Sequence, residues 1–190
     1  MSPGGHFVTT AVACTASAAL TASLPLTAGI ALGGFLIDVD HAVDYVLVER
    51  QRDLRPSAFL RYYLGGRVRR AVLVLHSYEL FAVLAAAAWW TDALPLWGYL
   101  LGGLMHLALD IVFNGELTPR SISAFYSFAY RLAHRFDTAA LFGPSQDRIV
   151  APGFWRAFFA GAELPATGPP SPVLTTGPGQ NLDSLRSRTP

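Results

Sequence analysis

The stretch GGFLIDVDHAVDY, residues 33–45, is the point where a long apolar part of the chain becomes acidic. Residues 7–37 carry no charged side chain, and four ionisable side chains then follow within seven residues: Asp38, Asp40, His41 and Asp44. A helix of about 20 apolar residues is long enough to cross a bilayer. Because the uncharged run is longer than one such helix needs, residues 33–45 mark the end of a segment that we expect to lie in a membrane.

Helices are the elements that the apolar segments predict. Pro25 divides the first run, since proline disfavours helical backbone at the residue before it. The turn TDALP separates two later apolar segments in the same way. The sequence therefore predicts an all-α fold, an integral membrane bundle of about four transmembrane helices: residues 7–22, 26–37, 71–90 and 95–113.

Glycine and aromatic residues add detail to this bundle. Gly98 and Gly102 lie four residues apart on the fourth predicted helix, where they would let a neighbouring helix approach closely. Residues 121–136 and 149–161 are short, aromatic and mixed with arginine, which is typical of interfacial helices. We expect residues 1–163 to form one helical membrane domain, and the Pro-, Gly-, Ser- and Thr-rich residues 164–190 to form a disordered tail.

The composition of the 190-residue chain agrees with a membrane protein. Hydrophobic residues make up 52% of the chain and charged residues only 14%, with a mean hydropathy of +0.37, whereas an average soluble domain is about 25% charged. The net charge of +1 gives no indication of a nucleic-acid partner. Cys14 is the only cysteine, which excludes an internal disulfide and a thiolate metal cluster.

Arginines predict the orientation of the bundle. The turn at residues 91–94 carries only Asp92, whereas the long loop of residues 42–70 carries seven arginines. The positive-inside rule places such a loop in the cytoplasm. We therefore expect the protein to be integral to the cytoplasmic (inner) membrane. The seven arginines are Arg50, Arg52, Arg55, Arg61, Arg67, Arg69 and Arg70.

Histidines and acids that are far apart in sequence should meet at the cytoplasmic end of this bundle. His76 and Glu79 are three residues apart on one predicted helix, and His106 and Asp110 are four apart on another, so each pair would share a helix face. A divalent cation would satisfy such buried groups together, and mixed imidazole and carboxylate ligands favour zinc, with manganese or iron as alternatives. The expected metal ligands are His6, Asp38, Asp40, His41, His76, His106 and Asp110.

Each of these residues also has a purely structural explanation. The acids of residues 38–44 could form a solvated helix end, and His6 could be an ordinary terminal residue. The pair of His76 and Glu79, and the pair of His106 and Asp110, could be polar contacts within or between helices. It is their common placement on one side of the membrane that favours a metal site.

At these positions the chain resembles the YdjM-like (DUF457) family of membrane-bound metal-dependent hydrolases. The resemblance covers about residues 4–120 and rests on four segments, GGHFVTTAVA, LIDVDH, LHSYEL and GLMHLALDIVFNGELTP. It implies a hydrolase with its metal site at the cytoplasmic membrane face. The chain departs from the family at Ala71, where many relatives have a further histidine, which puts a second metal in doubt.

The function predicted from the sequence is hydrolysis of a lipid or lipid-linked ester or phosphoester, with Glu79 or Asp38 as the catalytic base. Two alternatives remain open at this stage. The first is a non-catalytic membrane protein, either a metal-binding protein, an ion carrier or a scaffold. The second is an electron carrier in which His76 and His106 are the axial ligands of a haem. The sequence gives no information about oligomeric partners.

Overall fold

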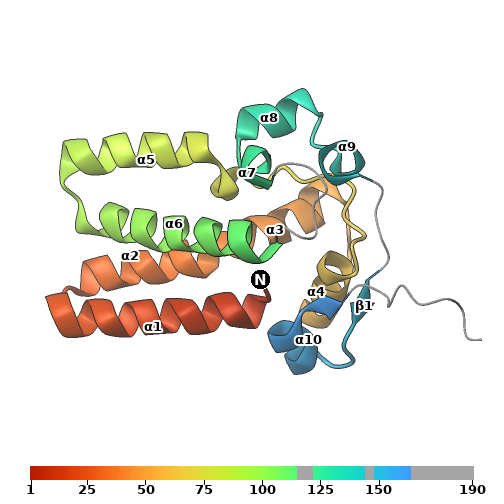
Figure 1. The fold of residues 1–190 in the computed structure, drawn as a ribbon, viewed down its shortest axis with the longest axis horizontal. Helices are drawn as coiled ribbons and strands as arrows, with labels where there is room; N and C mark the ends of the chain where they lie inside the picture. The colour runs from red at the N-terminus through yellow and green to blue at the C-terminus, as the bar shows by residue number, and fades with distance from the viewer. Residues whose placement is uncertain (115–121, 144–147, 164–190) are drawn as a thin grey trace, which may run out of the picture.

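The computed structural model describes residues 1–114, 122–143 and 148–163. The predicted disordered tail, residues 164–190, lies outside the described residues. The described part is predominantly helical, which confirms the all-α prediction, and its two strands are only two residues long each. Four longer helices form two antiparallel hairpins that lie side by side (Figure 1): α1 (Pro3–Thr21), α2 (Leu24–Gly34), α5 (Tyr78–Thr91) and α6 (Leu94–Asn114).

Local sequence explains the first hairpin. α1 begins at Pro3, and the side chain of Ser2 accepts a hydrogen bond from the backbone N–H of Gly5. α1 ends at Ala22, which has left-handed backbone, and Ser23 then caps α2 by accepting from the N–H of Leu26. Serine at a helix start and proline in the first turn are favourable. The hairpin predicted for residues 7–37 is therefore present, although its first helix begins four residues earlier than predicted.

Glycines bring α2 and α6 into backbone contact. A Cβ atom at Gly98 would overlap the carbonyl oxygen of Leu26, and one at Gly102 would overlap that of Ile30. On the facing helix, a Cβ at Gly33 would overlap the carbonyl oxygen of Tyr99. The predicted role of Gly98 and Gly102 in close helix approach is confirmed.

After α2 the chain bends by 46° and enters an irregular helical segment. Three acids of residues 40–49 bind the backbone of residues 69–75. The carboxylate of Asp40 accepts the N–H of Leu75, that of Asp44 accepts two N–H groups, and that of Glu49 accepts two more. The segment consists of the 3₁₀ turn η1 (Leu36–Asp38), α3 (Val39–Val43) and the π-helical turn η2 (Asp44–Val48), and α4 (Pro56–Leu64) follows it.

The third helix starts later than the sequence predicts. Residues 71–77 were expected to belong to a helix over 71–90, but α5 begins only at Tyr78, and His76 lies in a separate 3₁₀ turn, η3 (Val74–His76). Asp44 accepts the N–H groups of Val72 and Leu73, which takes these groups away from a helical ladder. The prediction that His76 and Glu79 share one helix face is therefore wrong.

The C-terminal part consists of short elements. The helix predicted over residues 121–136 is divided by Ser127, whose side chain caps the second piece. The segment predicted at 149–161 contains a strand and a helix. The bounds are α7 (Ile122–Phe125), α8 (Phe128–Ala133), α9 (Thr138–Phe142), β1 (Ile149–Val150), α10 (Phe154–Ala160) and β2 (Ala162–Glu163).

Among the described residues, α6 alone is a single unbroken helix that is both long and apolar enough to cross a membrane. A second candidate is the bent pair formed by α2 and residues 36–48. α5, with 14 residues, is about 21 Å long at 1.5 Å per residue. The structure therefore shows one or two candidate spans and does not by itself show four.

Candidate metal centre

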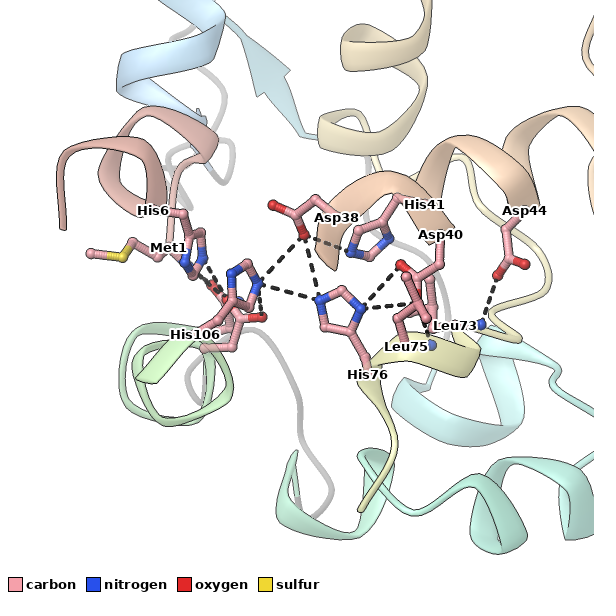
Figure 2. A network of polar contacts seen from close by, with 12 residues as sticks. Met1, His6, Asp38, Asp40, His41, Asp44, Leu73, Leu75, His76 and His106 are labelled. Atoms are coloured by element: carbon pink, nitrogen blue, oxygen red, sulfur yellow. Dashed lines mark hydrogen bonds and ion pairs between the residues drawn. The ribbon is translucent and has the colours of Figure 1, made fainter. Parts of the chain in front are cut away.

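The imidazoles and carboxylates predicted to meet do so at one end of the bundle, opposite the two tight turns (Figures 1 and 2). α1 contributes one histidine, the segment after α2 contributes three residues, η3 contributes another histidine, and α6 contributes a histidine and an aspartate. Most of their side chains are buried. The residues of this cluster are His6, Asp38, Asp40, His41, His76, His106 and Asp110.

His76 and His106 form the centre of the cluster, and their hydrogen bonds fix which ring nitrogen carries a proton. Nδ1 of His106 lies 2.9 Å from the carbonyl oxygen of Gly34 and must donate to it. Nδ1 of His76 lies 3.0 Å from both carboxylate oxygens of Asp40. In the neutral rings, Nε2 of each histidine is then an unprotonated acceptor, and these two atoms lie 3.3 Å apart. Two facing lone pairs at this distance require a cation or a proton between them.

Asp38 completes a triangle with these two imidazoles. Its Oδ1 lies 3.5 Å from Nε2 of His76 and 3.4 Å from Nε2 of His106. In a tetrahedral zinc site with bonds of about 2.0–2.2 Å, neighbouring ligand atoms are about 3.3–3.6 Å apart. The three atoms therefore have the spacing of one face of such a site, which leaves a fourth position for water or substrate.

The remaining members flank this triangle. Nε2 of His41 lies 3.4 Å from Oδ1 of Asp38, and Oδ2 of Asp110 lies 3.4 Å from Nε2 of His106. His6 stacks on the ring of His106 at 3.8 Å, and its Nε2 lies 2.9 Å from Oδ1 of Asp110. Two further sets of ligand atoms lie within 4.8 Å of one another: His6, His106 and Asp110, and Asp40, His41 and His76.

The hydrogen bonds separate direct ligands from residues that orient them. Asp40 is occupied by Nδ1 of His76 and the N–H of Leu75, which is the usual place of a carboxylate behind a metal-bound histidine. Asp110 accepts from Asn114 Nδ2 at 2.8 Å and from the Tyr126 hydroxyl at 3.1 Å. Asp38, His76 and His106 are therefore the best candidates for direct ligands among the seven.

Electrostatics favour a cation at this position. Carboxylate oxygens of Asp38 and Asp40 lie 3.5 Å and 3.0 Å from the ring nitrogens of His76. The same carboxylates attract any positive charge placed beside the Nε2 atom of His76. Asp38 and His41 are the most accessible side chains of the cluster, with 30% and 22% exposure compared with at most 10% for the others. The cluster is therefore open on the side of Asp38 and His41.

Glu79 lies in none of these ligand groups. Its carboxylate accepts from the Ser127 hydroxyl and from the backbone N–H groups of Phe128 and Ala129, at the start of α8. Both of its oxygens are thus used to cap a helix, which satisfies donors that have no partner within the helix. This placement supports a structural role for Glu79 rather than the role of catalytic base.

Replacing Glu79 with alanine is expected to leave the metal content and any hydrolytic rate unchanged. Because the cap of α8 is lost, the free energy of unfolding should fall by about 1–2 kcal/mol. Metal analysis and thermal unfolding in detergent would measure the two effects separately. A large fall in the rate at full metal content would instead restore Glu79 as the base.

Sequence reasoning missed Arg131 and Tyr126 and assigned no role to the carbonyl of Gly34. In the segment YRLAHRF, residues 130–136, Nδ1 of His134 donates to the carbonyl oxygen of Tyr130 at 2.8 Å, within α8 and its cap. The fully buried side chain of this segment is Arg131. Arg135, in the same segment, is exposed, and nothing in the sequence distinguishes the buried arginine from the exposed one.

Comparison with known proteins identifies no relative: no family model matches the chain, and no curated protein or solved structure shows significant similarity to it. The resemblance to the YdjM-like family therefore stays a prediction from four short segments.

Proposed function

We propose that this protein is a metal-dependent hydrolase embedded in the cytoplasmic membrane, and that Asp38, His76 and His106 bind its divalent cation. The observation that carries the proposal is the triangle of Oδ1 and two Nε2 atoms, with separations of 3.3–3.5 Å and with both Nδ1 atoms already committed to acceptors. Two histidines and one carboxylate with an open position are a recurrent ligand set of hydrolytic zinc sites. The same set also binds iron in other enzymes, and manganese remains an alternative.

The membrane part of the proposal is supported by apolar side chains on the outside of the helices. Leu20, Trp89 and Trp90 are more than 80% exposed at the tight turns, and Val112 is 70% exposed on α6. Tryptophan is typical of the interface between hydrocarbon and headgroups. We propose that α1, α2, α5 and α6 are all embedded, with both tight turns at the side of the membrane opposite the arginine-rich loop.

Helix length supports a lipid substrate. α5 is about 21 Å long, whereas the hydrocarbon core of a bilayer is about 30 Å thick. If the tight turn between α5 and α6 lies at the far interface, the other end of α5, next to His76, lies below the cytoplasmic surface. A scissile ester or phosphoester at that depth belongs to a lipid or a lipid-linked molecule.

The chemistry follows from the arrangement of the side chains. A bound divalent cation would lower the pKa of its water and polarise the oxygen of a carbonyl or phosphoryl group. Asp40 and the carbonyl of Gly34 hold the two imidazoles in the tautomer that offers Nε2. Figure 2 shows the second carboxylate oxygen of Asp38 turned away from the imidazoles, where it is placed to accept a proton.

Metal analysis of the purified protein, followed by an activity screen, tests this proposal. We expect about one equivalent of a divalent transition metal per chain, and metal-dependent hydrolysis of long-chain nitrophenyl esters or of phospholipids in mixed micelles. Less than about a tenth of an equivalent after supplementation with zinc, manganese or iron would refute it. One equivalent without hydrolysis of any ester or phosphoester would favour the non-catalytic alternative.

The haem alternative has less support from the geometry. A bis-histidine haem needs its iron and porphyrin between the two axial ligands. Here the two Nε2 atoms are 3.3 Å apart, and Asp38 lies beside both. The absorption spectrum of the purified protein tests this alternative directly, since a bound haem gives a strong Soret band.

A further inference from the structure

Arg131 is the largest fully buried side chain of the described residues. Its guanidinium donates to three backbone carbonyl oxygens, those of Leu73 at 2.8 Å, Phe125 at 2.9 Å and His76 at 3.1 Å. Its charge also lies over the ring of Phe125, at 5.2 Å. No carboxylate of the described residues forms an ion pair with it, which is unusual for a buried charge.

Two of these three carbonyls belong to the ends of η3, the turn that carries His76. Leu73 precedes η3 in left-handed backbone, with φ of 46°, which is unfavourable for a residue with a branched side chain. Its N–H is held by Asp44 and its carbonyl by Arg131. At the other end of η3, the carbonyl of His76 is held by Arg131 and its imidazole by Asp40.

η3 is therefore held between two groups of opposite charge. On one side, the carboxylates of Asp40 and Asp44 bind the N–H groups of residues 72, 73 and 75 and the imidazole of η3, and on the other, the guanidinium of Arg131 binds the carbonyls at the two ends of η3. The hydrogen bonds of residues 72–76 to these three side chains take the place of a regular helix or sheet ladder. Without Arg131, the carbonyl of His76 would lose a buried partner and that of Leu73 would keep the N–H of His76, so η3 and the imidazole it carries would be held less firmly.

We propose that Arg131 is a positioning residue of the metal site, which holds η3 so that Nε2 of His76 points at the cation. This inference rests on the proposed function, because it assumes that His76 is a ligand. A guanidinium is suited to this task because it presents several donors in a rigid plane. Lysine would supply the charge but would not span three carbonyls in one plane.

The test compares Arg131→Met, Arg131→Lys and the control Arg135→Met, which removes an exposed arginine four residues later in the chain. Cobalt(II) is the probe, and its binding is titrated by absorption in the purified, metal-free, full-length proteins. Arg131→Met should weaken cobalt binding roughly 10- to 100-fold, as removal of residues behind metal ligands typically does, and Arg131→Lys should restore only part of this loss. Arg135→Met should bind as wild type does.

Nitrogen NMR of the histidine rings in the metal-free proteins gives a readout that a general loss of stability would not change. Wild type should show His76 protonated at Nδ1 alone under conditions where the ring is neutral, and Arg131→Met should show a mixture of tautomers. Should Arg131→Met fail to fold, Arg131→Lys carries the same two measurements.

The outcomes separate the two proposals. If wild type binds cobalt and the Arg131 variants bind it with unchanged affinity and spectrum, the positioning role is overturned while the metal site stands. If wild type binds no cobalt, the metal site fails and the positioning role fails with it. A loss of affinity in the Arg131 variants with one fixed His76 tautomer would also overturn the proposed mechanism of positioning.

Discussion

His76→Ala and His106→Ala are each expected to remove the bound metal from the purified protein and to abolish its metal-dependent hydrolysis. Each substitution deletes one of three atoms that lie 3.3–3.5 Å apart. Two remaining ligands do not hold a divalent cation firmly, so the loss of affinity should exceed the roughly 10- to 100-fold effect of outer partners. Metal analysis and the hydrolytic rate, measured on the same preparations, give the two values.

His134→Ala is the matched control, because it also removes an imidazole, and this one belongs to none of the candidate ligand sets of the described residues. It should keep wild-type metal content and rate. Full metal content in both His76→Ala and His106→Ala would refute the assigned site, because each of the three candidate ligand sets of the described residues contains His76 or His106.

Gly102→Leu is expected to cause the largest loss of stability. A side chain at this position would overlap the carbonyl oxygen of Ile30 and the backbone nitrogen of Gly34, and backbone cannot move aside as a flexible side chain can. Overpacking of this kind costs about 1–3 kcal/mol or more. We expect a much lower midpoint of thermal unfolding in detergent, together with weaker metal binding, since the carbonyl of Gly34 orients His106.

Ala86→Leu is the control for added volume on a helix, because Ala86 lies on the exposed face of α5. It should leave both the unfolding midpoint and the metal content close to those of wild type. An unchanged unfolding midpoint in Gly102→Leu would contradict the close contact of α2 and α6.

The apolar pattern predicted the helical fold well. Charge-free runs, prolines and turn residues located both hairpins, and the spacing of Gly98 and Gly102 predicted the close helix contact correctly. These features are local, so the sequence alone expresses them. The same reasoning placed His6, Asp38, His76 and His106 at one end of the bundle, because hairpins of similar length return the chain to the same side.

The detailed arrangement of the site could not be predicted, because it depends on hydrogen bonds between distant residues. Residues 71–77 have a helical pattern, but Asp40 and Asp44 bind their N–H groups and prevent the helix. The acids of residues 38–44 looked equivalent in sequence, whereas only Asp38 has an oxygen facing both central imidazoles. Glu79 was a predicted catalytic base but caps α8, and Arg131 had no predicted role but binds the carbonyl of Leu73. Both roles depend on backbone groups far away in the sequence.

The π-helical turn at residues 44–48 has a consequence for how the chain can vary. Asp40, Asp44 and Glu49 are spaced four and five residues apart, and this uneven interval lets all three reach successive backbone groups between residues 75 and 69. Deleting one residue of the α-helical part between Asp40 and Asp44 would rotate Asp44 and Glu49 by about 100° relative to Asp40 and detach residues 69–73 while leaving residue 75 attached. The number of residues between Asp40 and Asp44 is therefore fixed by the backbone groups that the two carboxylates have to reach, so insertions and deletions there should be far less tolerated than changes of side chain on the outer face of this segment.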